Sequence, residues 1–141
     1  MRFVITARPA DDKPQSAVPP SDDLIAAYMR FNEEMHNAGV LVASEGLNPG
    51  APGARIVVAG GKRKLLDGPF AESKELVGGF YVLEVASLEE AKKWALRCPT
   101  GLGSDDILEV RQLTGSEDVP PEMVALTQKV APNWSKTWVK K

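Results

Sequence analysis

The sequence has few of the residues from which metal sites and covalent cross-links are built. Its 141 residues include one histidine, His36, and one cysteine, Cys98. A single cysteine excludes a disulfide within the chain, as is usual for cytosolic proteins. One histidine and one cysteine cannot form a conventional zinc site. We therefore expect a cytoplasmic protein without a bound metal.

Long apolar runs and an excess of charge of one sign are also missing. No stretch reaches the roughly 20 apolar residues of a membrane-spanning helix, and the apolar N-terminal residues are too few for a secretory signal. Lys and Arg total 17 and Asp and Glu total 19, for a net charge of −2, whereas a nucleic-acid-binding domain would carry a basic face. Neither of the glycine-rich phosphate-binding motifs GxxxxGK(S/T) and GxGxxG occurs in the sequence. These absences predict no membrane, nucleic-acid or cofactor partner.

The residue patterns that are present predict a single α+β domain. Amphipathic helices are expected at 22–38 and 88–98, where apolar residues recur at helical spacing. The two-residue link Gly60-Gly61 predicts a β-hairpin over 55–66. Other strands are expected from alternating or continuous apolar residues, at 2–8, 40–47, 78–87 and 107–113. Without the hairpin, this order is the ferredoxin-like split βαβ pattern of an antiparallel sheet.

The strand at 78–87 carries bulky side chains on both of its faces. Phe80 and Val82 share one face, and Tyr81, Leu83 and Val85 share the other. A strand of this kind is usually covered on both sides. The two helices can cover only one face, so we expect the second face to be covered by the same sheet of a second copy, since homodimers are the commonest oligomers.

The stretch KRKLLDGPFAESKELVGGFYVLEV, residues 62–85, carries the most specific pattern in the chain. Its elements occur in a fixed order, namely Asp67-Gly68-Pro69-Phe70, Glu72, Lys74-Glu75, Gly78-Gly79 and, further on, Cys98-Pro99. Together with LVASEGL upstream and EEAKKWALRCP downstream, it resembles the YCII-related family in its DGPF-containing branch. The resemblance covers residues 1 to about 113, so we predict a domain at 1–113 and a C-terminal extension at 114–141. It implies a dimeric α+β barrel, in which two ferredoxin-like sheets face each other around a cavity.

Asp67 and His36 are the candidate catalytic residues. A histidine–aspartate pair has been proposed as an active site in the wider YCII group, and the resemblance extends this idea to His36 and Asp67. His36 is the only side chain whose ordinary pKa lies near neutrality. The structural alternatives are a boundary histidine on its helix, and an Asp67 that sets a turn by hydrogen bonding to its own backbone two residues on.

Five further residues are candidates for binding a ligand. Glu45 is a carboxylate on an otherwise apolar strand, and it either lines the cavity or lies at its rim. Glu72 and Lys74 either converge on a small carboxylate or hydroxy acid or form a solvated turn. Phe70 and Tyr81 are candidate walls of the cavity. Glu84 and Arg111 are candidates for a cross-strand ion pair.

Two functional hypotheses remain open at this point. In the first, the protein binds a small polar organic ligand between the sheets, with cofactor-free acid–base chemistry as an extension. In the second, it is a non-catalytic regulatory or protein-interaction module, whose binding surface is the 48–53 loop and the tail. Trp134 and Trp138 in the tail are expected to dock on the body or on the partner subunit, because exposed aromatic area usually marks a contact.

Overall fold

The computed structural model describes residues 1–9, 21–48, 53–68, 77–99 and 106–139, which form an α+β fold. Each helix and strand expected from the sequence is present, with ends shifted by a few residues. In chain order the elements are β1 (Arg2–Pro9), α1 (Asp22–Asn37), β2 (Leu41–Gly46), β3 (Ala54–Ala59), β4 (Lys62–Asp67), β5 (Gly79–Glu84), α2 (Leu88–Leu96), β6 (Asp106–Gln112), a 3-10 turn (Ser116–Asp118), α3 (Pro121–Val130) and α4 (Ser135–Trp138).

Four strands form one antiparallel sheet in the order β2-β5-β1-β6, and β3 and β4 form a separate hairpin. This order confirms the ferredoxin-like fold. It also places β1 between β5 and β6, so the expected pairing of Glu84 with Arg111 on adjacent strands is wrong. The cross-strand neighbour of Glu84 is Arg2, and that of Arg111 is Val4.

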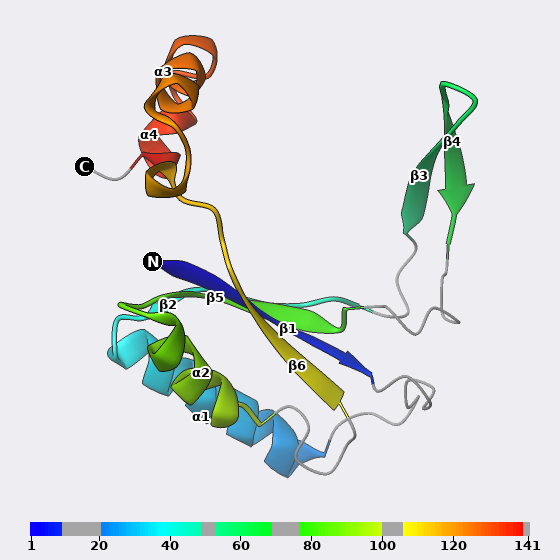
Figure 1. The fold of residues 1–141 in the computed structure, drawn as a ribbon. Coiled ribbons are helices and arrows are strands. Elements are labelled where there is room, and N and C mark those ends of the chain that lie inside the picture. Colours follow the sequence, from blue (N-terminus) through cyan, green and yellow to red (C-terminus); the bar gives the residue numbers. More distant parts are fainter. Residues whose placement is uncertain (10–20, 49–52, 69–76, 100–105, 140–141) are drawn as a thin grey trace.

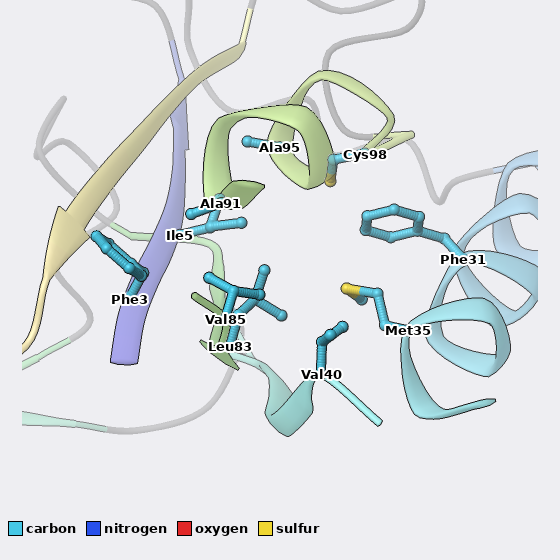
Figure 2. Packing of buried hydrophobic residues seen from close by; sticks show 10 residues of the cluster. All are labelled: Phe3, Ile5, Phe31, Met35, Val40, Leu83, Val85, Ala91, Ala95 and Cys98. Atoms are coloured by element: carbon cyan, nitrogen blue, oxygen red, sulfur yellow. The ribbon is translucent and has the colours of Figure 1, made fainter. Parts of the chain in front are cut away.

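Helices α1 and α2 lie side by side on one face of the sheet, and the core lies between them and the strands (Figure 1). Figure 2 shows the buried side chains of this core, which are Phe3, Ile5, Phe31, Met35, Val40, Leu83, Val85, Ala91, Ala95 and Cys98. The ring of Phe31 meets the edge of Tyr81 with centroids 5.7 Å apart and planes at 89°, a favourable aromatic geometry.

Local interactions fix where the two helices begin. Ser21 Oγ accepts a hydrogen bond from the Leu24 amide at the start of α1. At the start of α2, Ser87 Oγ accepts from the Glu90 amide at 3.2 Å, and the Glu90 carboxylate accepts from the Ala86 amide at 3.1 Å. These bonds satisfy amide groups that have no partner within the helix.

The hairpin turns where the sequence predicted. Gly60 and Gly61 have φ values of 57° and 76°, which glycine adopts without steric cost and which a primed two-residue turn requires. At the base of the hairpin, the Gly68 amide donates to the Gly53 carbonyl at 2.8 Å. Figure 1 shows that the hairpin rises on the side of the sheet opposite to α1 and α2.

The C-terminal helices rise on that same side, at the other end of the sheet (Figure 1). Trp134 and Trp138 stack with centroids 5.5 Å apart and planes at 16°. Trp138 Nε1 donates to the Thr114 carbonyl at 3.3 Å, so the tail folds back on its own start. Trp134 is nevertheless 56% exposed, and docking of the tail on a partner stays a prediction.

Candidate functional site

The face of the sheet turned away from α1 and α2 is the candidate site, and we call it the open face. Because side chains alternate along a strand, the burial of Phe3, Ile5 and Leu83 against the helices turns their neighbours to this face. Val4 of β1 lies opposite Val82 of β5, which lies opposite Ala43 of β2. The centre of the open face is therefore apolar.

A second row across the open face adds polar groups at both edges of the sheet. It runs from Glu45 on β2 through Phe80 on β5 and Thr6 on β1 to Glu109 on β6. Opposed residues in an antiparallel sheet share a face, so an aromatic ring and a hydroxyl lie between two carboxylates. This arrangement can bind a molecule with an apolar body and hydrogen-bond donors at its ends.

Charge and backbone geometry shape the two edges differently. On β6, Arg111 Nε lies 3.7 Å from Glu109 Oε1, so that edge carries both signs of charge. On the β2 side, a Cβ atom at Gly79 would lie 2.9 Å from the Glu45 carbonyl oxygen. Such a contact is too close, so glycine at this position allows β5 to approach the end of β2 that carries Glu45.

The structure places several residues that were predicted to form one site on different parts of the fold. Glu45 is exposed on the open face, as a cavity-lining or rim acid would be. Asp67 is exposed and is the last residue of β4, a strand that rises on the open side of the sheet (Figure 1). His36 is exposed in the last turn of α1, in the helical layer. Within one chain, His36 and Asp67 thus belong to elements on opposite sides of the sheet.

Three other candidates, Phe70, Glu72 and Lys74, lie outside the described residues. The proposed turn-setting bond of Asp67 is wrong on chemical grounds, because the residue two positions on is Pro69, which has no backbone N–H. What the structure shows at Asp67 is backbone pairing with Ala54 at the base of the hairpin.

Tyr81 lies on the helix-covered face and not on the open face. Its cross-strand neighbours are Ile5 of the core and Ser44, whose hydroxyl lies 3.3 Å from Asn32 Oδ1 of α1. Burial, and then the adjacent Cys98 thiol, raise the pKa of the Tyr81 hydroxyl. Tyr81 is thus a half-buried residue that packs against the core within this chain, and Phe80 is the aromatic residue of the open face.

The raised pKa of Tyr81 gives a testable pH dependence. Its neutral form is favoured in the folded protein, so the stabilisation is complete below the ordinary pKa of 10.0 and is lost progressively as the pH rises above it. In an ultraviolet phenolate titration of the folded protein, one of the two tyrosines should ionise only well above that pH. Tyr81→Phe should remove this late component. Full ionisation of both tyrosines near pH 10 without unfolding would contradict the assignment.

The described residues contain neither a cluster of metal-ligating side chains nor a membrane-spanning helix. No three His, Cys, Asp or Glu side chains within them gather as a metal site would require. None of the helices within them is long and apolar enough to cross a bilayer.

Similarity to known proteins assigns the domain. A model of the YCII-related domain matches residues 1–114. The chain belongs to the YCII-related family. An uncharacterised protein of Rhizobium meliloti (strain 1021) is 34% identical over 99 residues, which are 70% of this chain and 69% of that protein.

Among solved structures, the YCII-related chain is similar to the 5-chloro-2-hydroxyhydroquinone dehydrochlorinase TftG of Burkholderia phenoliruptrix AC1100, determined in complex with 2,5-dihydroxybenzoquinone. The identity is 16% and the TM-score 0.44, over 85% of this chain and 100% of that one. The match to the family model confirms the expected membership of the YCII-related family, whereas the DGPF-containing branch stays a prediction.

Sequence reasoning did not single out three residues of the open face of this YCII-related chain, namely Thr6, Phe80 and Glu109. A signal for them was present. In residues 2–8, Thr6 alternates onto the face of Val4, and in residues 78–87, Phe80 shares the face of Val82. Only the register between strands, which periodicity does not provide, aligns the three residues in one row with Glu45.

Proposed function

We propose that this YCII-related protein is a cytoplasmic homodimer that binds a small polar organic ligand between the open faces of its two sheets. The observation that carries the proposal is the open face itself, with an apolar centre at Val4 and Val82 and carboxylates at its edges. Half-buried apolar strand residues on one face favour coverage by another apolar surface, and an isologous pair of sheets satisfies this for both chains at once. The lone cysteine supports the cytoplasmic location.

The ligand class follows from the chemistry of the second row. The ring of Phe80 offers an apolar surface, and the carboxylates of Glu45 and Glu109 accept hydrogen bonds. Small hydroxy acids and small hydroxylated rings combine an apolar body with such donors. The guanidinium of Arg111 adds a partner for a ligand carboxylate.

Acid–base chemistry without a cofactor is the catalytic extension of this proposal. A carboxylate can remove a proton from a bound molecule only within hydrogen-bond reach of it. Glu45 meets this requirement for a ligand stacked on Phe80, its cross-strand neighbour. Asp67 is our second candidate, because the hairpin that carries it rises on the open side of the sheet.

The test is a thermal-shift panel of small hydroxy acids and hydroxylated ring compounds, followed by titration of any compound that raises the melting temperature. Glu45→Gln keeps the size and hydrogen bonding of the side chain but removes its charge, and we expect at least about a tenfold loss of affinity from one lost charged hydrogen bond. Asp67→Asn tests the second candidate in the same way. Glu33→Gln, an exposed change on α1, is the matched control.

Two outcomes would count against the proposal. Full binding by the Glu45→Gln and Asp67→Asn variants would remove both carboxylates from the site. The absence of any shift across the panel, together with a protein partner that co-purifies with the tail, would favour the non-catalytic interaction module instead.

A further inference from the structure

Helix α3 carries an apolar stripe that the described part of the chain leaves open. Met123, Leu126 and Val130 follow one another at helical spacing, and their side chains are 50%, 60% and 74% exposed. Trp134 extends the same series beyond the helix. Scattered exposed apolar residues are common, but an aligned series marks a contact surface. We call these four residues the tail stripe.

The hairpin carries a second open apolar surface. Ile56 and Leu65 are direct cross-strand neighbours, and Val58 shares their face because it lies two residues beyond Ile56. Their exposed fractions are 68%, 60% and 71%. An isolated two-stranded hairpin is only marginally stable in water, so this surface gains from being covered. We call these three residues the hairpin face.

Within one chain the tail stripe and the hairpin face are far apart. The hairpin follows β2, whose last residue Gly46 lies at the end of the sheet marked by Gly79 and Ala7. The tail follows β6, whose last residue Gln112 lies opposite Phe3, at the other end of the sheet. Figure 1 shows the two arms rising from these opposite ends on the same side of the sheet. A second chain can bring such surfaces together.

The symmetry of two facing sheets allows two arrangements of the arms. A two-fold axis running across the strands exchanges the two ends of each sheet, so the tail of one chain meets the end at which the other hairpin rises. An axis parallel to the strands keeps each end in place and brings two hairpins to the same end. The two arrangements therefore predict different neighbours for the hairpin face.

Charge decides between these arrangements. The hairpin, residues 54–67, has four basic residues and one acidic residue, so its net charge is +3. The first half of the tail, residues 114–127, has three acidic residues, Glu117, Asp118 and Glu122, and no basic one, so its net charge is −3. The second half, residues 128–141, has four lysines and no acidic residue, so its net charge is +4. Two hairpins at one end would repel each other, whereas a hairpin attracts the acidic first half of a tail, which includes the start of α3.

We propose that the tail stripe of one chain packs on the hairpin face of a second chain, and that the second chain returns the same contact. This inference rests on the homodimer proposed above. It assigns the segment beyond the matched domain a structural role, since each tail closes one end of the space between the sheets. Asp67, at the base of the hairpin, then lies where the arm meets that space.

Disulfide trapping between two single-cysteine variants tests the contact. Each of the three hairpin-face residues and three tail-stripe residues (Met123, Leu126 and Val130) is changed singly to cysteine, for example Val58→Cys or Leu126→Cys. Every hairpin variant is mixed with every tail variant, allowed to exchange subunits and treated with a mild thiol oxidant. At least one mixture should yield covalent dimers, up to about half of the chains if the subunits exchange at random. The parent chain, whose only cysteine is the buried Cys98, should yield none.

The outcomes separate this inference from the homodimer itself. Cross-links in a hairpin variant on its own would show that two hairpins meet, and would overturn the exchange of arms. A dimer mass by light scattering without a cross-link in any mixture would also overturn the exchange. Neither outcome would contradict the proposed homodimer. A monomer mass for the parent chain would overturn both. Because the substituted side chains are more than one-third exposed, each variant should fold as the parent does.

Discussion

Val82→Lys should convert the proposed dimer into a monomer. Val82 lies at the centre of the open face, between Val4 on β1 and Ala43 on β2. In the proposed dimer this position is enclosed between two sheets, where an unpaired ammonium group loses its hydration. The effective cost of burying a charge is several kcal/mol. Since 1.4 kcal/mol corresponds to a factor of ten, the dissociation constant should rise by about a hundredfold or more.

Light scattering or sedimentation over a range of micromolar concentrations measures the effect. Leu96→Lys is the matched control, because it places the same charge at an 86% exposed position on α2. The control should keep the mass of the parent. Far-ultraviolet circular dichroism should remain the same in both variants, because neither position belongs to the buried core. A Val82→Lys protein with the parent's dimer affinity would show that the open face is not the interface.

Sequence patterns predicted the helices and strands of this protein because each depends on a local physical cause. Residues 22–38 carry apolar side chains at helical spacing and end before Gly39, which has a φ of 71°. The hairpin turn depends on two glycines with positive φ, and the sequence places Gly60 and Gly61 at these two positions. The ferredoxin-like pattern followed from the order of these elements along the chain once the hairpin was set aside.

The neighbours of individual side chains were harder to predict, because periodicity assigns a face to a residue but no partner. Glu84 and Arg111 share the open face, yet β1 separates their strands. The ferredoxin-like order already implied this, so a stricter use of the predicted topology would have avoided the error. Tyr81 was correctly predicted to share a strand face with Leu83. It was wrongly predicted to line the cavity, because that face is the one covered by the helices.

The residues of the candidate site were also hard to predict, because their relative positions depend on the pairing of strands that are distant in the sequence. Asp67 and His36 are linked by the family resemblance, whereas the elements that carry them, β4 and α1, lie on opposite sides of the sheet within one chain (Figure 1). Glu45 was noticed as a charge on an apolar strand, a local signal. Its alignment with Phe80, Thr6 and Glu109 depends on the register of four strands, including the shift between Leu41 and Ala43. A bulge of this kind changes the direction in which side chains point, and no pattern in the sequence of residues 40–47 predicts it.

Leu83→Ala should produce a large loss of stability. Leu83 lies on the inner strand β5, is 0% exposed, and has Phe3 and Leu41 as its cross-strand neighbours. Its removal takes apolar area from the centre of the core and leaves a cavity that strands paired on both sides cannot collapse to fill. Substitutions of this type cost about 2–5 kcal/mol, and the position of Leu83 favours the upper half of that range.

Urea unfolding followed by tryptophan fluorescence measures this loss, with all variants at one protein concentration, because dissociation and unfolding are coupled in a dimer. The control is Leu96→Ala, the same chemical change at an 86% exposed side chain, which should alter the free energy of unfolding by no more than about 0.5 kcal/mol. The slope of the transition should stay the same for both variants, so that the midpoint alone shifts. If Leu83→Ala shifted the midpoint no more than Leu96→Ala, the core between α1, α2 and the sheet would not be what holds this fold together.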